Sequence, residues 1–442
     1  MTDRFRKVPA GRLSRLMGFG QMAAGIGGAM LGEGVKRLAR GDRPHLSDLL
    51  LTPGNAARVT DQLSRLRGAA MKLGQMISLD AGDVLPPELT AILARLRDSA
   101  HFMPPAQLNT VLIRNWGRDW RLRFAEFEAR PIAAASIGQV HRARLHNGRL
   151  VAVKVQYPGI ANSIEADVDN VATLLRLSGI VPDGLDLKPL LAAAKVQLKE
   201  EADYLREAKQ MRRYATLLAD DDRFVIPRPY DALTSADILV MDFVEGRPIE
   251  ALDTASQDQR DKAMEALLDL AMRELFVFGF MQTDPNFANY RWQPDSGRIV
   301  LLDFGAARPI PPDTSEAYRE MLAAGLAQDR ESLWCALIKI GFISPGMRAS
   351  HGPALDAMLD TILTHVHKPG PFDFADRSFV EPMRNLAVPI AADRANWHLP
   401  PTDTLFVQRK ISGMALMAAR LKAQLPLMTM VRDRLDHPGG RG

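Results

Sequence analysis

The sequence predicts an α+β fold in which a strand-rich segment stands between helical segments. Residues 57–79 keep a helical stripe of apolar side chains. From Phe124 the period changes to that of strands, and Asn147-Gly148 between two apolar runs is a strong hairpin signal. Residues 314–436 return to a helical pattern rich in Met, Leu and Ala. We therefore expect a helical extension, a strand-rich lobe and a helical lobe.

The composition is that of a globular protein with a sizeable core. The chain has 442 residues, 47% hydrophobic and 24% charged, which is enough for two or three domains. A net charge of only +4 gives no indication of a nucleic-acid partner. The single cysteine, Cys335, excludes an intrachain disulfide and favours a reducing compartment. No Cys/His cluster has the spacing of zinc ligands.

The beginning of the chain predicts a basic, glycine-rich segment. Residues 1–40 carry eight Lys/Arg against Asp3 and Glu33. Residues 16–32 are uncharged, contain six glycines and lie at the lower length limit for spanning a bilayer. Two interpretations stay open: a small-residue helix packed on the body, or an amphipathic segment on an anionic membrane. No other stretch is long and apolar enough for a transmembrane helix.

The most informative stretch, residues 281–305, carries two carboxylates and an amide. Asp284 and Asn289 are separated by four residues, as are the base and the metal-binding Asn of the kinase catalytic loop. Asp303 opens Asp-Phe-Gly directly after the apolar run Ile299–Leu302, so it should lie at the end of a buried strand. Mg²⁺ prefers such oxygen ligands. The stretch predicts a Mg²⁺–nucleotide site with Asn289 and Asp303 as metal ligands and Asp284 positioning the attacking group.

A hairpin upstream predicts the phosphate-binding part of the same site. An Ala-rich loop with one serine precedes the strand 140–145, in the place of a Gly-rich loop whose amides approach phosphates. The second strand contains Val-Ala-Val-Lys154, which matches the kinase strand whose lysine contacts the α/β-phosphates. We expect contacts to the nucleotide from the lysine and from the loop residues Ala133, Ala134, Ala135 and Ser136.

A lysine in this position requires a glutamate on a nearby helix. Residues 188–217 predict one helix, after inserted helices over 160–185. Three of its acids share a face by their spacing, whereas Glu201 lies to the side. Spacing alone does not identify the partner of Lys154, and a solvated acidic face is the alternative. The three acids on one face are Glu200, Asp203 and Glu207.

Two more strands are predicted over 224–229 and 238–246. The second ends where a kinase hinge would meet adenine, so Met241 and Val244 are expected to offer backbone groups. After Asp-Phe-Gly the chain enters a helix near Thr314, without a long activation segment and without Ala-Pro-Glu. That segment is the platform on which protein kinases dock peptides. A peptide substrate is therefore disfavoured.

Together these motifs resemble those of the UbiB-like (aarF-domain) atypical kinases, and most closely the coenzyme Q branch. Lys72-Leu-Gly-Gln75 resembles the family's Lys-x-Gly-Gln motif, and Ala133–Ser136 resembles its Ala-rich loop. Glu201-Ala-Asp203 resembles its Glu-x-Asp motif. The loop from Gln282 to Asn289 resembles that of the coenzyme Q branch. The likeness covers nearly the whole chain.

The resemblance implies a protein-kinase-like, two-lobed fold with an N-terminal helical extension and inserted helices in the N-lobe. It implies Glu207 as the partner of Lys154. It also implies a regulatory contact of Lys72 and Gln75 with Glu201 and Asp203, where a peptide would enter. The expected division of the chain is 1–45 (basic, membrane-proximal), 46–122 (helical extension), 123–245 (N-lobe) and 246–442 (C-lobe).

The resemblance further implies hydrolysis of ATP to ADP with Mg²⁺ in support of ubiquinone biosynthesis. Membrane lipid and quinone-precursor-like molecules are the expected stimulants, other quinone-biosynthesis enzymes the expected partners, and a homodimer a further candidate assembly. The chain lacks a long mitochondrial presequence and the C-terminal hydrophobic helices of some bacterial members. We expect a peripheral protein on the bacterial inner membrane, with the mitochondrion as the alternative. A protein or small-molecule kinase and a nucleotide-switched lipid-binding scaffold are the alternative functions.

Overall fold

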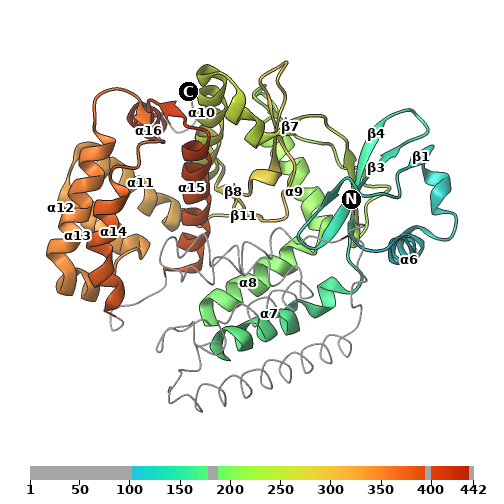
Figure 1. The fold of residues 1–442 in the computed structure, drawn as a ribbon, viewed down its shortest axis with the longest axis horizontal. Coiled ribbons are helices and arrows are strands. Elements are labelled where there is room, and N and C mark those ends of the chain that lie inside the picture. The colour runs from blue at the N-terminus through green and yellow to red at the C-terminus, as the bar shows by residue number, and fades with distance from the viewer. Residues whose placement is uncertain (1–101, 178–187, 394–399, 438–442) are drawn as a thin grey trace, which may run out of the picture. The chain divides into compact units, whose positions relative to one another are not determined.

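The computed structural model describes residues 102–177, 188–393 and 400–437 (Figure 1). The chain forms two compact units. Of the described residues, the first unit contains those up to Arg212 together with Arg228–Phe243, and the second contains Arg213–Pro227 and those from Val244 onward. Three expected features lie outside the described residues, namely the apolar segment 16–32, the helix 57–79, and Lys72 with Gln75.

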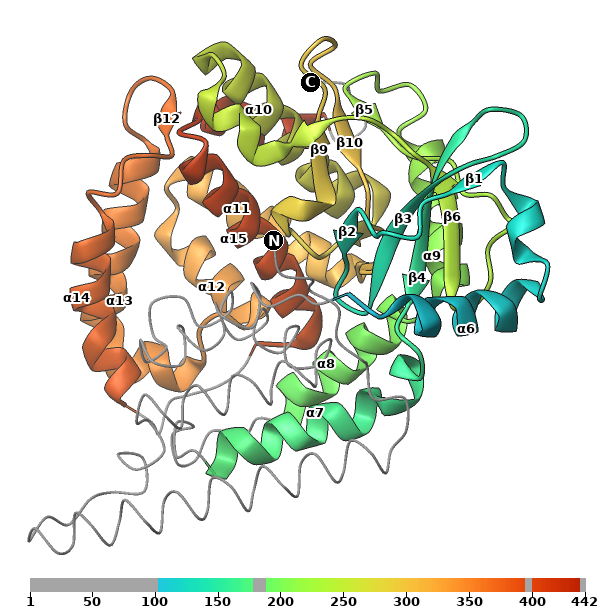
Figure 2. The ribbon, with the colours of Figure 1, turned by 45° about the vertical axis from the view of Figure 1, so that its right-hand side comes forward.

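The first unit is built on an antiparallel sheet of five strands in the order β1-β3-β4-β6, with β2 paired to β3. Figure 2 shows β3, β4 and β6 as neighbours. The β3–β4 turn closes at Gly148, whose φ of +83° favours glycine, as the Asn-Gly signal predicts. The bounds are β1 Glu126–Phe127, β2 Ala133–Ala134, β3 Gly138–Arg144, β4 Leu150–Gln156 and β6 Ile238–Asp242.

The helices of the first unit differ from the sequence prediction at one place. Residues 188–217 form two helices, not one, because the chain breaks at Ala202 and Asp203. The Asp203 carboxylate accepts the Arg206 N–H at 2.9 Å and starts a new helix as its N-cap. Gln156 Nε2 donates to the Ala202 carbonyl at 2.8 Å and holds the break against β4. The helices are α6 Pro105–Trp116, α7 Ile160–Leu177, α8 Lys188–Glu201 and α9 Tyr204–Leu217.

A series of buried hydrogen bonds starts from two polar side chains of strand β3. Gln139 Nε2 donates to His141 Nε2 at 2.9 Å, so the proton of the neutral ring sits on Nδ1, which donates to the Glu128 carbonyl at 2.9 Å. The Met103 N–H donates to Gln139 Oε1 at 2.8 Å. Burial lowers the pKa of His141 to about 4, against the raising effect of the Glu128 hydrogen bond.

We expect the stability of the first unit to fall between pH 6.5 and pH 4. The unfolded chain binds a proton on His141 in this window while the folded chain does not, so stability rises with pH. The difference from an ordinary pKa of 6.5 corresponds to about 3 kcal/mol of unfolding free energy. Urea unfolding at pH 7 and pH 4.5 measures it. His141→Gln should remove this part of the pH dependence, and an unchanged slope in that variant would contradict the assignment.

The described residues of the second unit form three small sheets. One has the order β5-β10-β9-β7, a second pairs β11 with β8, and a third pairs β12 with β13. The expected strand 224–229 is only Phe224–Val225, and it pairs in parallel with β10. The bounds are β5 Phe224–Val225, β7 Arg247–Pro248, β8 Phe280–Gln282, β9 Tyr290–Trp292, β10 Ile299–Leu301, β11 Ala307–Pro309, β12 Phe372–Asp373 and β13 Gln424–Leu425.

The rest of the second unit is mainly helical, so the fold class is α+β as predicted. Helix α10 starts with a capping box of Ser256 and Gln259 and continues into one π-helical turn, Glu274–Phe278. Among the described residues, no helix has the length and apolar character needed to span a bilayer. The helices are α10 Gln257–Arg273, α11 Pro312–Ala327, α12 Arg330–Ile340, α13 Pro345–Val366, α14 Val380–Ala392, α15 Thr402–Arg420 and α16 Leu427–Asp436.

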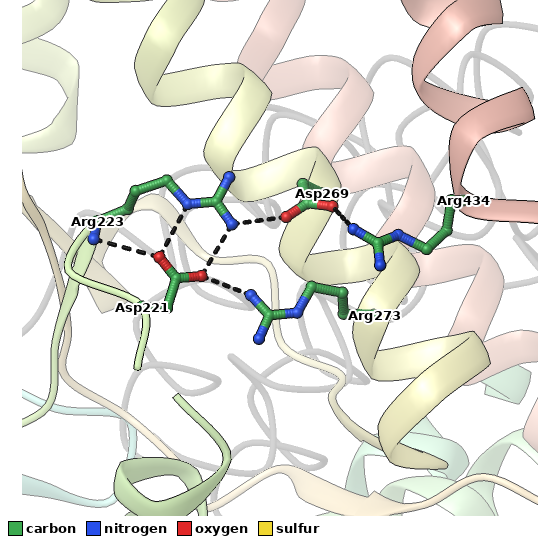
Figure 3. Close-up of polar contacts among 5 residues, drawn as sticks. All are labelled: Asp221, Arg223, Asp269, Arg273 and Arg434. Atoms are coloured by element: carbon green, nitrogen blue, oxygen red, sulfur yellow. Dashed lines mark hydrogen bonds and ion pairs between the residues drawn. The ribbon is translucent and has the colours of Figure 1, made fainter. Parts of the chain in front are cut away.

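An ionic network connects α16, α10 and the segment before β5 (Figure 3). The Arg223 guanidinium contacts Asp221 at 2.8 Å and Asp269 at 2.7 Å, and Arg273 and Arg434 each contact one of these carboxylates. Burial would raise the pKa of Asp221, but the hydrogen bonds from Arg223 and Arg273 outweigh it and lower this pKa to about 2. Asp221 therefore stays ionised at neutral pH, and the network ties α16 to the body of the unit.

Candidate active site

Lys154 lies in the middle of the first unit's sheet and faces α9. Its Nζ donates to both carboxylate oxygens of Glu207, at 2.9 and 3.1 Å. Both side chains are buried, with Lys154 7% exposed and Glu207 0%. The ring of Tyr204 lies 5.2 Å from the ammonium. The structure thus selects Glu207 among the acids that spacing had left open, and it builds the lysine–glutamate pair that phosphate orientation requires.

The Ala-rich loop is held against strand β3. Ala133 and Ala134 pair with Val140 and Gln139, and the Ala135 N–H donates to the Gly138 carbonyl at 2.9 Å. These contacts fix the loop backbone close to the start of β3.

Gly138 has a steric role that the sequence pattern did not reveal. A Cβ at Gly138 would lie 2.3 Å from the Val155 carbonyl oxygen, so a side chain there would force β3 away from β4. A glycine is therefore required where the loop joins the strand.

The Glu-x-Asp residues have different positions. Glu201 ends α8 and accepts a hydrogen bond at 3.0 Å from Ser136 in the Ala-rich loop. Asp203 is exposed and caps α9, the helix that carries Glu207. The contact of both residues with Lys72 and Gln75 stays a prediction, because those two residues lie outside the described ranges.

The expected hinge residues lie at the end of β6. Met241 is buried within the paired stretch, in register with Ala152 of β4. The Phe243 N–H donates to the Leu150 carbonyl at 3.0 Å, so the pairing continues to Phe243. Val244 follows and belongs to the second unit. The adenine contacts of Met241 and Val244 stay predictions.

Asp284, Asn289 and Asp303 lie on adjacent segments of the second unit. Asn289 Nδ2 donates to the Asp284 carbonyl at 3.1 Å and lies 3.5 Å from its Oδ2. The Leu302 N–H donates to the Asn289 carbonyl at 2.9 Å, which brings Asp303 beside this loop. The Asp303 Oδ1 accepts the Gly305 N–H at 3.0 Å.

This donor set fits Mg²⁺. The Asn289 amide nitrogen points to Asp284, so its oxygen is the remaining ligand atom, and Asp303 adds a carboxylate. Mg²⁺ usually takes one or two protein oxygens and completes its octahedron with phosphates and water. Within the described ranges, no group of three His, Cys, Asp or Glu side chains could hold a metal ion without such help.

The chain after Asp-Phe-Gly is short and paired. Strand β11 pairs with β8 in the register Ala307 with Gln282 and Pro309 with Phe280. The Thr283 hydroxyl also donates to the Ala306 carbonyl at 2.9 Å. Helix α11 follows at once, so residues 303–312 leave no length for a peptide-docking segment, as the sequence predicted.

Helix α15 contacts the catalytic loop at a position that motif analysis missed. A Cβ at Gly413 would lie 2.2 Å from Pro285 Cγ and 2.4 Å from its Cβ. Pro285 directly follows Asp284. A glycine inside a helix is a weak signal of such close packing, because it costs about 1 kcal/mol relative to alanine.

We expect Gly413→Ala to lower the rate of ATP turnover by at least about tenfold. The added Cβ would push Pro285 aside, and Asp284, which directly precedes Pro285, would move with it. Steady-state kinetics and thermal unfolding check this. Gly325→Ala on α11 is the matched control, since a Cβ there meets no atom within 4 Å. Equal turnover in the two variants would contradict the prediction.

Fold and site together define a kinase-like enzyme of phosphoryl transfer. The ABC1 atypical kinase-like domain matches residues 95–336, and the chain belongs to this family. This confirms the resemblance to the UbiB-like kinases.

Named relatives extend the match to nearly the whole chain. It is 37% identical over 436 residues to "Atypical kinase COQ8, mitochondrial" of Saccharomyces cerevisiae, covering 96% of this chain and 85% of the relative. It is 37% identical over 437 residues to "Atypical kinase COQ8B, mitochondrial" of Rattus norvegicus, covering 98% and 82%. Among solved structures, Rv3197 of Mycobacterium tuberculosis, in complex with erythromycin, matches with a TM-score of 0.56 and 25% identity over 86% of this chain and 95% of that one.

Proposed function

We propose that this chain binds ATP with Mg²⁺ and hydrolyses it to ADP at a membrane surface, in support of coenzyme Q biosynthesis. The observation that carries the proposal is the buried, bidentate Lys154–Glu207 pair. A lysine buried in a sheet and held by a helix glutamate is the arrangement that orients nucleotide α/β-phosphates. The COQ8 relatives support the biosynthetic context.

The proposed chemistry is mainly electrostatic and positional. Lys154 orients the α/β-phosphates, and Glu207 holds Lys154. Asn289 and Asp303 would hold Mg²⁺, which supplies positive charge to the β- and γ-phosphates. Asp284 positions the attacking water, and its orientation is supported by the Asn289 amide.

Water is the proposed acceptor because the structure offers no platform for a peptide at the expected place. The β8–β11 pairing leads the chain from Asp303 directly into α11. We further propose that Lys72 and Gln75, with Glu201 and Asp203, restrict access to the site. Membrane lipid, quinone-precursor-like molecules and other quinone-biosynthesis enzymes are the proposed partners, on the bacterial inner membrane or in the mitochondrion.

An ATPase assay with and without anionic vesicles and a phenol-like quinone precursor tests this function. We expect Mg²⁺-dependent phosphate release that the additions increase. Phosphate transfer to a protein that exceeds hydrolysis would favour a protein kinase instead. Nucleotide binding without hydrolysis under all conditions would favour a nucleotide-switched scaffold.

We expect Ala133→Gly to change the relative affinity for ADP and ATP. Glycine loosens the backbone that β2 holds against β3, and a looser loop reshapes the phosphate contacts. Titration of both nucleotides checks this, with Ala125→Gly outside the loop as the control. Unchanged affinities for both nucleotides would count against a role of the loop in phosphate binding.

A further inference from the structure

A buried ionic cluster in the second unit has no part in the chemistry proposed above. The Lys410 ammonium, on α15, lies 3.3 Å from Glu274 Oε2 and donates to the Tyr290 hydroxyl at 3.2 Å. Glu274 accepts a hydrogen bond from the Tyr214 hydroxyl through Oε1 at 2.6 Å. Lys410 and Glu274 are each only 1% exposed. Two opposite charges are thus enclosed in the core of this unit.

The cluster is connected to both ends of the catalytic loop. On one side, the Gln282 N–H donates to Glu274 Oε1 at 3.2 Å, and Gln282 Oε1 accepts the Asp284 N–H at 3.2 Å. On the other side, Tyr290 directly follows Asn289. A displacement of the Lys410 ammonium would therefore displace the loop residues Asp284 and Asn289.

Two further features link the cluster to the loop. Glu274 begins the π-helical turn that follows α10, and such turns are rare and frequent at functional sites. Helix α15 meets the loop a second time at Gly413, three residues after Lys410 and on the same helix face. The helix therefore supports the loop through a charge at one position and through close packing at the other.

A gain in stability does not explain why these two charges are buried. Each buried ion loses several kcal/mol of hydration, and well-packed apolar residues in place of a buried pair are often neutral or stabilising. The charged pair instead fixes the positions of the groups that it joins. Burial opposes the charge on Lys410, but Glu274 and Tyr290 outweigh it and raise the Lys410 pKa above its ordinary value. The ammonium is therefore charged at neutral pH.

We propose that Lys410 is a positioning residue, which acts through Glu274 and Tyr290 to hold the catalytic loop in the geometry that Asp284 and Asn289 need. The part that concerns turnover rests on the proposed ATPase function. The part that concerns metal affinity rests only on the proposed binding of nucleotide and Mg²⁺, with Asn289 and Asp303 as the ligands, and does not need hydrolysis.

The test uses the double variant Lys410→Met/Glu274→Gln in the full chain, because removing only one charge would leave its partner buried and unpaired. We expect thermal unfolding near that of the wild type. We expect kcat to fall by about 10- to 100-fold, with the KM for ATP at saturating Mg²⁺ changed by less than about threefold. We expect the Mg²⁺ concentration for half-maximal nucleotide affinity to rise about tenfold.

Arg434→Met is the matched control, because it breaks a buried ion pair with Asp269 on α10 that belongs to the network of Arg223 and not to the Lys410 cluster (Figure 3). It should lower stability and keep the kcat of the folded protein. A folded double variant with wild-type kcat and Mg²⁺ dependence would overturn the proposal, as would an equal loss of kcat in Arg434→Met. A wild type without turnover, whose Mg²⁺-dependent affinity still requires Lys410, would remove the ATPase function and leave the positioning role supported.

Discussion

Asp303→Asn should reduce Mg²⁺-dependent ATP turnover by at least about 100-fold. The change removes one negative charge from a proposed Mg²⁺ ligand and should weaken metal binding directly. The fold should survive, because the asparagine oxygen can still accept the Gly305 N–H that Asp303 Oδ1 accepts at 3.0 Å. Phosphate release at saturating ATP over a range of Mg²⁺ concentrations measures the loss.

Asp295→Asn is the matched control for this variant. Asp295 is an exposed residue in the turn between β9 and β10, so the same charge is removed between the two proposed metal ligands in sequence but outside the proposed site. We expect wild-type turnover in Asp295→Asn. Wild-type turnover in Asp303→Asn, or an equal loss in both variants, would contradict the assignment of Asp303 as a metal ligand.

Local patterns in the sequence predicted the elements that carry the motifs. The hairpin around Asn147-Gly148 was predictable because its turn needs a positive φ, which Gly148 adopts at +83° without strain. Strand β10 ends just before Asp303 because the apolar run Ile299–Leu302 fits a buried strand. The absence of a peptide-docking segment also follows from chain length alone. Each of these inferences depends on neighbours in the sequence.

Other parts of the site depend on contacts between distant residues. Spacing alone did not single out Glu207, which only the family resemblance implied, and the helix break at Ala202 depends on Gln156 from another element. The pairing of Lys410 with Glu274 joins two helices that no spacing rule relates. Gly413 could be noted as a helix glycine, but only the structure shows that Pro285 fills the missing side chain's space.

Glu207→Gln is expected to destabilise the first unit by about 3–5 kcal/mol and to abolish turnover. The glutamine would keep the shape of the side chain but remove the carboxylate that accepts two hydrogen bonds from the buried Lys154 ammonium, so the bidentate ion pair is lost. Glu165→Gln is the control, since its ion pair with Lys199 has both side chains more than half exposed and should be worth no more than about 0.5 kcal/mol. Urea unfolding and the ATPase assay give the two readouts.

The double variant Lys154→Met/Glu207→Gln separates the structural role of this pair from its chemical role. It removes the lysine charge together with the carboxylate charge, so most of the lost stability should return, because an apolar side chain tolerates the buried position. Turnover should stay absent, because no cation remains to orient the α/β-phosphates. A stable double variant that hydrolyses ATP like the wild type would show that the pair serves the fold alone. A double variant as unstable as Glu207→Gln would show that the loss came from packing and not from the broken ion pair.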